Sequence, residues 1–378
     1  MNLQKHSILG LRFVKVALGV SLVMGGGFGC SRSSPPSVVD QTEIQPKESI
    51  PANATHLRGA GATFPALLYR RWFSAYHGIN QGTYVTYEAV GSGEGVRRFI
   101  GKGISVEQSV DFAASDAAMS DAEITKADNN VLMIPATAGC VVLAYNLPGY
   151  TGELRLSRRT YTAIFEGDIK DWSDPQIARD NPGVKFPRLT ITTVVRQDGS
   201  GMTFALTRNL DTISEKWRSR YGPAMLVDWP GNAMRATGNQ GVAGLIEESN
   251  GSIGYVGYEF ARRIGLNFAS LENKDAKYVK PSEQSCAKAL ATAVVPENLR
   301  MFVPDPPGPD SYPLVTFSWI LLHKSYRDAS TADEVRRLLQ WSLQDGQRYA
   351  SELGYVALPS EVATKAVAAI DTIGPRSR

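Results

Sequence analysis

Hydrophobic and polar positions alternate with two different periods from about residue 57 onward. Short runs of apolar and β-branched residues predict buried strands at 84–88, 132–135, 141–145, 189–195 and 314–322. Between them, apolar residues recur at helical spacing, as in Leu68, Trp72 and Tyr76 after Pro65, and again over 334–353. Because strands alternate with helices, we expect an α/β protein with layered, mostly parallel sheets.

The first 29 residues have the pattern of a secretion signal. Lys5, Arg12 and Lys15 precede the short apolar run 16–24 and a glycine-rich stretch that leads to Cys30. A run this short does not predict a permanent membrane span. Two interpretations remain: an ordinary cleaved signal peptide, and a bacterial lipoprotein signal that is cut before Cys30. Gly29 fits the lipoprotein pattern, whereas Gly27 departs from its usual leucine.

Residues 30–56 are predicted to form a flexible tether. The segment 31–37 is built from serine, proline and one arginine, so it cannot bury a core. A tether between a lipid-bearing cysteine and a folded domain favours the lipoprotein interpretation. We therefore expect an exported protein that is anchored through lipid on Cys30.

Composition and charge limit the partners of the folded part. The chain has 378 residues, of which 43% are hydrophobic and 20% charged, enough for two domains. The net charge of +3 equals the three cations of the signal, so the remaining chain is neutral. This balance argues against nucleic acid as a partner. Cys140 lies in an apolar run, and we expect an unpaired buried cysteine there, although export allows a disulfide with Cys286.

Four segments rich in glycine and hydroxyl groups together predict an oxyanion site. They are 61–65 (Gly-Ala-Thr-Phe-Pro), 91–95 (Gly-Ser-Gly-Glu-Gly), 114–116 (Ala-Ser-Asp) and 196–203 (Arg-Gln-Asp-Gly-Ser-Gly-Met-Thr). Three of them lead into predicted helices, whose first turns present unpaired N–H groups and a positive dipole end. In an open α/β sheet such loops gather at the carboxyl ends of the strands.

Charged residues in these segments narrow the ligand class. Arg196 and Asp198 are two residues apart on a strand and point to one side, so Asp198 can hold the guanidinium; the alternative is a surface ion pair. Asp116 suits an anion site only if the ligand carries a proton. Phosphate does so at neutral pH and sulfate does not, and such a hydrogen bond can reject the analogue strongly. The alternative for Asp116 is a helix cap.

The motifs of common enzymes are missing from the sequence. Ser92 and Ser200 do not lie in G-x-S-x-G, and the four histidines suggest no catalytic triad. The glycines of 91–95 fail the dinucleotide spacing, and 101–103 lacks the other residues of a P-loop. Clusters with metal-ligand spacing are also missing, so we expect no metal and no cofactor.

Several segments, in this order, resemble the phosphate-binding proteins of bacterial ABC phosphate importers. They are 59–65, 111–116, 142–149, 164–167, 170–172, 196–201, 253–256 and 353–359. The resemblance covers about residues 57 to 370. It implies a two-lobed periplasmic-binding-protein fold of type II, in which each lobe is a mostly parallel sheet flanked by helices, with a hinge between them. After the signal (1–29) and tether (30–56), lobe I would be 57–144 plus 313–378, and lobe II 145–312.

The same resemblance implies the residues that contact the ligand. The phosphate-binding set would be Thr63, Phe64 through its N–H, Ser92, Asp116, Arg196, Ser200, Gly201 and Met202, with Asp198 and Thr203 in support. The family usually has threonine where this chain has Met202, so one hydroxyl is missing. A lost hydrogen bond to a charged ligand costs about 1.5–3 kcal/mol.

The sequence thus predicts a non-catalytic protein that binds inorganic phosphate between two lobes and delivers it to an ABC permease with its ATPase subunits. We expect a monomer in the periplasm or at the cell surface, without cofactor, metal or nucleic acid. The alternatives are an extracellular phosphate sensor, a phosphatase-like enzyme on the same scaffold, and a binder of another tetrahedral anion such as arsenate.

Overall fold

A computed structural model describes residues 50–51 and 53–376, and its compact folded unit begins at Ile50. The predicted signal peptide, Cys30 and most of the predicted tether lie outside the described residues. The first strand begins at Thr55, two residues inside the segment predicted as tether. Across the described part of the chain, no helix combines the length and the apolar character that a bilayer crossing requires.

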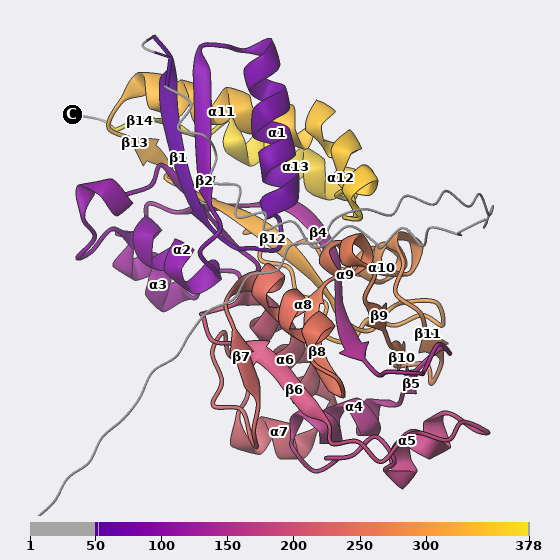
Figure 1. Ribbon diagram of the computed structural model, residues 1–378. Coiled ribbons are helices and arrows are strands. Elements are labelled where there is room, and N and C mark those ends of the chain that lie inside the picture. Colours follow the sequence, from indigo (N-terminus) through magenta and orange to yellow (C-terminus); the bar gives the residue numbers. More distant parts are fainter. Residues whose placement is uncertain (1–49, 52, 377–378) are drawn as a thin grey trace, which may run out of the picture. The chain divides into compact units, whose positions relative to one another are not determined.

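A nine-stranded sheet organises the described residues (Figure 1). Its order is β2-β1-β3-β12-β4-β8-β6-β7, with β9 also paired to β4. The pairs at the two ends are parallel, whereas β12 and β4 run antiparallel to their neighbours. The strands are β1 Thr55–Gly61, β2 Thr83–Glu88, β3 Phe112–Ser115, β4 Leu132–Asn146, β6 Thr192–Arg196, β7 Met234–Ala236, β8 Ser252–Gly257, β9 Asn267–Phe268 and β12 Val315–Leu322.

Strand β4 joins the two ends of the sheet. Its first part, 132–140, pairs with β12, and its second part, 141–146, pairs with β8. The sequence predicted two strands here, at 132–135 and 141–145, and the structure merges them. The small residues 136–139 between them are polar or weakly hydrophobic, but β12 and β8 supply backbone partners along the whole length.

Helices cover both faces of each end of the sheet. The order β2-β1-β3 and right-handed crossovers put α1 and α2 on opposite faces, and the order β8-β6-β7 does the same for α6 and α8. The helices are α1 Ala66–Ile79, α2 Ser92–Ile100, α3 Asp121–Lys126, α4 Arg158–Phe165, α5 Pro175–Asp180, α6 Gly201–Ile213, α7 Glu215–Arg220, α8 Gly238–Glu248, α9 Tyr258–Ile264, α10 Glu283–Leu290, α11 Ala329–Leu343, α12 Arg348–Leu353 and α13 Ser360–Ile370.

Short elements complete the fold. They are β5 Arg155–Leu156, β10 Ser270–Glu272 and β11 Tyr278–Val279 in one small sheet, β13 Ser325–Tyr326 and β14 Gly374–Pro375 in another, and the 3₁₀ turns η1 Val106–Gln108 and η2 Asp345–Gln347. The turn η2 interrupts the helix predicted over 334–353. Trp72 donates its Nε1 hydrogen to the Gly346 carbonyl at 2.7 Å, and a side chain at 346 would collide with that indole.

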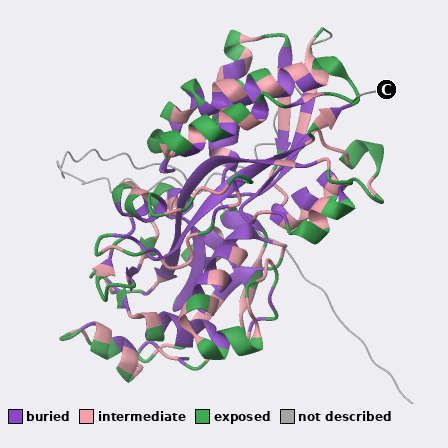
Figure 2. Ribbon diagram, turned by 180° about the vertical axis from the view of Figure 1, so that it is seen from behind, coloured by how far each residue is buried: buried purple, intermediate pink, exposed green. Residues whose placement is uncertain are grey.

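The core follows the sheet, whose central strands β3, β12, β4 and β8 are buried, while the outer helix faces are exposed (Figure 2). Trp72, Trp172, Trp217 and Trp319 are all fully buried. Cys140 on β4 and Cys286 on α10 form a disulfide with Cα atoms 5.6 Å apart. The expectation of an unpaired Cys140 was therefore wrong. Their separation of 146 residues carried no sign that α10 packs on β4.

Candidate functional site

The four predicted segments come together in space because each follows the carboxyl end of a strand. Residues 62–65 connect β1 to α1, residues 89–91 connect β2 to α2, Asp116 follows β3, and residues 197–200 connect β6 to α6. Of the predicted site residues, Thr63, Phe64, Ser92, Asp116, Arg196, Ser200, Met202 and Thr203 are each at most 7% exposed. Gly201 is also buried, and the Asp198 side chain is 15% exposed. The structure thus places them in the interior rather than on the surface.

Glycines allow these loops to touch. A Cβ atom added at Gly201 would lie 2.4 Å from Cβ of Asp116, so only glycine lets the start of α6 approach that residue. At Gly91, which has a φ of 95°, an added Cβ would lie 2.3 Å from Oδ2 of Asp198. Backbone contact also closes the site, because the Gly93 amide donates to the Gly199 carbonyl at 2.9 Å.

The Ser92 hydroxyl connects two of the loops. Its Oγ accepts the amide hydrogens of Asp116, at 3.1 Å, and of Gly201, at 3.2 Å. A hydroxyl oxygen has two lone pairs and one hydrogen. Because both lone pairs are occupied, the Ser92 hydroxyl can act toward a ligand only as a donor.

Thr63 is arranged in the same way by a residue that sequence analysis did not select. Its Oγ1 accepts from the backbone amide of Asn239 at 3.1 Å and from Nδ2 of that side chain at 2.9 Å. Oδ1 of Asn239 in turn accepts from the Gly257 amide. Asn239 therefore fixes the Thr63 hydroxyl as a donor. The sequence pattern that could have identified Asn239 is Thr237-Gly238-Asn239, a glycine-containing helix start at the beginning of α8.

The first turn of α6 supplies further donors. Ser200 caps the helix by accepting from the Thr203 amide at 3.3 Å, which leaves the Ser200 hydroxyl hydrogen for a ligand. The backbone amides of Met202 and Phe64 donate to no acceptor within the described residues. The Thr203 hydroxyl is paired with the Tyr255 hydroxyl at 2.6 Å, so it lies in a supporting layer.

The predicted pair of Arg196 and Asp198 is present at the end of β6. Nε of Arg196 donates to Oδ1 of Asp198 at 2.7 Å, and Nη2 donates to Oδ2. Burial disfavours the ionised Asp198, but the hydrogen bonds and charge of Arg196 outweigh it and hold the pKa of Asp198 below its ordinary value. The guanidinium is buried, so this pair is not the weak surface ion pair that was the alternative.

Asp116 differs from Asp198 because it has no cation in contact. Burial raises the pKa of Asp116 to about 7, while the Ser318 hydroxyl and the charge of Arg196 act in the opposite direction. Its Oδ1 is buried without a hydrogen-bond partner among the described residues. The helix-cap alternative is not what the structure shows, since α3 is capped by Ser120 together with Glu123. Asp116 is thus a buried acceptor among donors.

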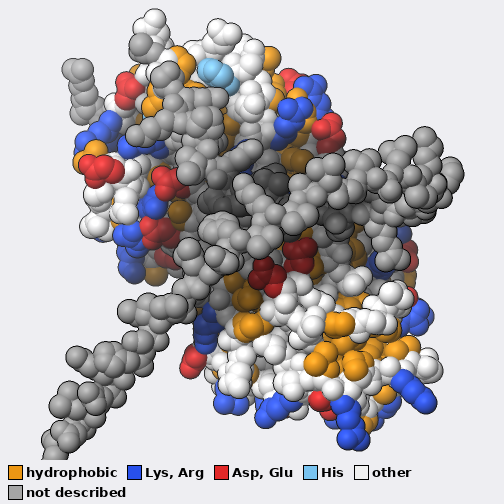
Figure 3. Space-filling model, in the orientation of Figure 1, with side chains coloured by type: hydrophobic (Ala, Val, Ile, Leu, Met, Phe, Trp, Pro, Cys, Tyr) orange, Lys and Arg blue, Asp and Glu red, His pale blue; other side chains and the backbone are white. Residues whose placement is uncertain are grey.

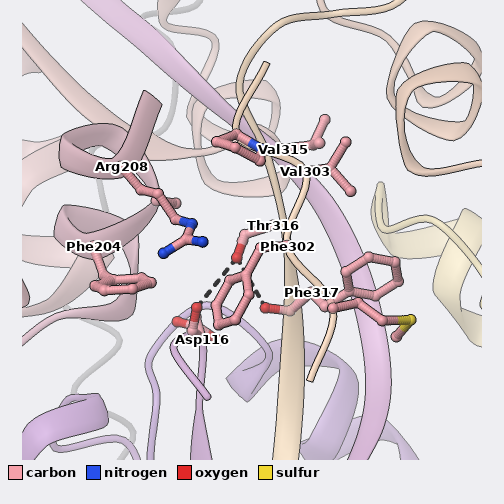
Figure 4. A pocket seen from close by; sticks show the side chains of 11 residues that line it. Asp116, Phe204, Arg208, Phe302, Val303, Val315, Thr316 and Phe317 are labelled. Carbon is pink, nitrogen blue, oxygen red and sulfur yellow. Dashed lines mark hydrogen bonds between the residues drawn. The ribbon is translucent and has the colours of Figure 1, made fainter. Parts of the chain in front are cut away.

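A small cavity of about 20 Å³ lies on one side of Asp116 (Figure 4). Phe204, Arg208, Phe302 and Thr316 contribute to its wall, and the Thr316 hydroxyl donates to the Asp116 carbonyl at 3.2 Å. This volume suits about one water molecule.

Where grey atoms leave the visible face uncovered, Lys and Arg side chains occur together with Asp and Glu, and Lys and Arg predominate along the lower edge (Figure 3). In the described residues, no group of His, Cys, Asp or Glu could hold a metal ion. The neutral composition predicts that selectivity for an anion arises inside the site.

Comparison with known proteins gives consistent matches over most of the chain. Residues 46–345 match the PBP superfamily domain. The phosphate-binding protein PstS of Pasteurella multocida is 38% identical over 320 residues, which cover 84% of this chain and 90% of that protein. The phosphate-binding protein PstS of Haemophilus influenzae is 35% identical over 314 residues, which cover 82% of this chain and 91% of that protein.

Solved structures show the same fold. A high-affinity periplasmic phosphate-binding protein, PfluDING, bound with phosphate, superposes with a TM-score of 0.68 at 21% identity, over 83% of this chain and 93% of that one. The phosphate-binding protein from Stenotrophomonas maltophilia gives the same TM-score, identity and coverage. The expected fold, the mixed α/β fold of type II periplasmic binding proteins, is confirmed.

Proposed function

This chain belongs to the PBP superfamily and, within it, to the PstS phosphate-binding proteins, and we propose that it binds inorganic phosphate and delivers it to an ABC permease. Relatives at 38% and 35% identity carry the name phosphate-binding protein. The site segments resemble those of the binding proteins of phosphate importers. The question is then how this chain's residues would select phosphate.

One observation carries the proposal: Asp116, a buried acceptor without a partner for Oδ1 among the described residues, lies next to Ser92, and the Ser92 and Thr63 hydroxyls can only donate. The Ser92 and Thr63 hydroxyls are committed as donors by the amides that they accept from. A fully deprotonated oxyanion would satisfy the donors but would leave the Asp116 carboxylate unpaired against negative charge. Hydrogen phosphate satisfies both, because it accepts from the donors and donates its own proton to Asp116.

The roles of the remaining residues follow from their placement. Arg196 would neutralise the anion through the N–H groups of its guanidinium that do not bond Asp198. Asp198 would fix the orientation of the guanidinium. Ser200 and Met202 would donate from the start of α6, where the helix dipole also favours negative charge. The Gly201 amide, which the resemblance also assigns to the ligand, already donates to Ser92 and would hold that hydroxyl in place. Phe64 would donate through its amide, with its carbonyl held by the Tyr355 hydroxyl at 2.7 Å.

Entry of the ligand requires movement, since the site residues are buried. We propose that lobe I (57–144 plus 313–378) and lobe II (145–312) separate about β4 and the chain before β12. The contacts that would break are those between distant loops, such as Ser92 with Gly201 and Thr63 with Asn239. Because these contacts lie beside the proposed anion, ligand binding would favour the closed arrangement.

We further propose an exported monomer that is held at the membrane by lipid on Cys30, within the periplasm or at the cell surface. The Cys140–Cys286 disulfide supports an oxidising compartment. A binding protein, rather than a phosphatase-like enzyme, is supported by the names of the relatives. Among the described residues, neither the Ser92 hydroxyl nor the Ser200 hydroxyl donates to a histidine that could activate it as a nucleophile.

A calorimetric titration of the purified protein with phosphate, sulfate and arsenate tests the function. We expect tight phosphate binding with one site per chain, and sulfate binding weaker by several powers of ten. Arsenate should bind as well, because it has the same shape and protonation. Equal affinities for phosphate and sulfate would contradict proton recognition by Asp116, and no phosphate binding would contradict the function itself.

A further inference from the structure

Three buried polar atoms around Asp116 lack a hydrogen-bond partner among the described residues. They are Oδ1 of Asp116, Oγ of Ser318 on β12, and the hydroxyl oxygen of Tyr69 on α1. Buried polar atoms without partners are rare in folded proteins and call for an explanation. The three side chains are at most 2% exposed.

The strand register places Ser318 beside Asp116. Strands β3 and β12 are antiparallel, with Ser115 facing Trp319 and Ala114 facing Ile320. The next residues, Asp116 after the end of β3 and Ser318 at an irregularity in β12, follow the Ser115–Trp319 pair and therefore lie near one another. Two residues earlier on β12, the Thr316 hydroxyl donates to the Asp116 carbonyl (Figure 4).

Tyr69 is the third buried group. Its ring is fixed by Trp72, with centroids 5.5 Å apart, and by Tyr87, with centroids 5.3 Å apart. Burial and the charge of Asp116 raise the pKa of Tyr69, and the Ser318 hydroxyl lowers it. The same Ser318 hydroxyl lowers the pKa of Asp116, so it interacts with both groups.

The donor and acceptor capacity of the three groups allows a hydrogen-bond chain in only one direction. An ionised carboxylate only accepts, whereas serine and tyrosine hydroxyls can each donate one hydrogen. The arrangement that satisfies all three atoms runs from Tyr69 to Ser318 to Oδ1 of Asp116. It leaves Oδ2 of Asp116 for the proton of the ligand.

We propose that Ser318 and Tyr69 are positioning residues for Asp116: they orient its carboxylate, stabilise its ionised form and thereby set the preference for phosphate over sulfate. The inference rests on the proposed function, but its central claim concerns the protonation of Asp116 and can be measured without a ligand. A neutral Asp116 can donate a hydrogen bond to an unprotonated oxyanion. Loss of the Ser318 hydroxyl should therefore help sulfate and not phosphate.

Other titratable groups also interact with Asp116. They are Arg196 at the end of β6, Tyr69 on α1, Tyr87 on β2, Glu259 on α9 and Tyr355 after α12. The tyrosines, whose pKa values are raised by burial, stay neutral between pH 5 and pH 8.5. Glu259 is the other carboxyl that can titrate there, so the Asp116 signal must be resolved from it.

The first experiment measures phosphate and sulfate affinity by calorimetry between pH 5 and pH 8.5 in the parent, Ser318→Ala and Tyr69→Phe. In the parent, sulfate binding should strengthen as pH falls through the Asp116 midpoint. In Ser318→Ala that midpoint should rise by roughly one to two pH units, and the phosphate-to-sulfate ratio at pH 7 should fall by roughly 10-fold or more. Tyr69→Phe should change the Asp116 midpoint and the phosphate-to-sulfate ratio in the same directions, but by smaller amounts.

Matched variants separate this role from general loss of packing. Ser318→Thr keeps the hydroxyl and should restore the parent's midpoint. Ser342→Ala removes a buried serine hydroxyl on α11, and Tyr312→Phe removes another buried tyrosine hydroxyl without a partner. Neither should move the midpoint, and an equal shift in either control would overturn the proposal.

The second experiment titrates the Asp116 carboxyl carbon by NMR in the ligand-free protein, with the signal assigned from Asp116→Asn. Its midpoint should rise in Ser318→Ala. An unchanged midpoint would overturn the positioning role whether or not phosphate binds. A raised midpoint together with no phosphate binding in the parent would retain the positioning role and reject the proposed function.

Discussion

Nε of Arg196 donates to Oδ1 of Asp198 at 2.7 Å, across only two positions of sequence, while both side chains are withdrawn from solvent. Asp198 also accepts from the Gly238 amide at 3.1 Å, so the start of α8 holds the carboxylate from the other side. The guanidinium is therefore fixed before any anion arrives. Such pre-organisation reduces the ordering cost of binding.

Replacing Arg196 with alanine should weaken phosphate binding by at least about 100-fold, because a charged donor is lost and Asp198 is left buried without its cation. Calorimetry measures the affinity. Arg158→Ala is the matched control, since Arg158 makes a similar two-point pair with Asp305 away from the site. Comparable losses in both variants would show that Arg196 does not face the ligand.

Asp116→Asn should lower the phosphate-to-sulfate affinity ratio by at least about 10-fold at pH 8. The amide can donate as well as accept, so it no longer penalises an unprotonated oxyanion. Because burial raises the pKa of Asp116 to about 7, sulfate binding by the parent should improve as pH falls below 7, and the variant should lack this dependence. A parent-like ratio in Asp116→Asn would refute proton recognition.

Met202→Thr should strengthen phosphate binding by roughly 10-fold, because it restores a hydroxyl donor at the start of α6. The Met202 side chain is fully buried, so the same change should lower the free energy of unfolding by about 1–3 kcal/mol. Met301→Thr, also at a buried methionine, should lower stability without improving affinity. Calorimetry and urea unfolding measure the two effects, and unchanged affinity in Met202→Thr would mean that its hydroxyl does not reach the anion.

Glu259→Gln should stabilise the ligand-free protein at neutral pH. Burial raises the pKa of Glu259 well above its ordinary value, and neither carboxyl oxygen has a partner among the described residues. The folded chain thus retains a proton that the unfolded chain releases above about pH 4.5, and the parent loses stability as pH rises. The advantage of the variant should grow by about 1.4 kcal/mol per pH unit until the folded pKa is reached.

Urea unfolding at pH 4.5, 6 and 8 measures this dependence, with Glu283→Gln on the surface of α10 as the control. The Glu259→Gln curve should converge with the parent near pH 4.5. A difference that does not vary with pH would show that Glu259 is ionised in the folded protein.

Removing the disulfide with Cys140→Ala and Cys286→Ala together should lower the free energy of unfolding by about 3–5 kcal/mol. The bond closes a loop of 146 residues, whose entropy in the unfolded chain is then restricted. Phosphate affinity should stay near that of the parent, because neither sulfur belongs to the site. Thermal unfolding with and without reductant gives an independent measurement, and an unchanged melting temperature would contradict a structural role.

The parts of the site that sequence analysis identified are those set by local backbone geometry. Glycine and hydroxyl residues after a predicted strand start a helix wherever they lie, so the starts of α1, α2 and α6 and the pairing of Arg196 with Asp198 could be predicted from neighbouring residues. The alternation of strands and helices likewise indicated the α/β class, because hydrophobic periodicity is a local property.

Tertiary structure alone decided which distant groups complete the site. Asn239 bonds Thr63 across 176 residues, and Ser318 comes near Asp116 because β12 pairs antiparallel with β3. The Cys140–Cys286 bond and the continuity of β4 depend in the same way on the packing of α10, β8 and β12. The residues next to a buried polar residue in the sequence do not indicate which group will lie opposite it in the sheet. Its partner is set by strand order and register, which arise when the whole sheet buries its faces together.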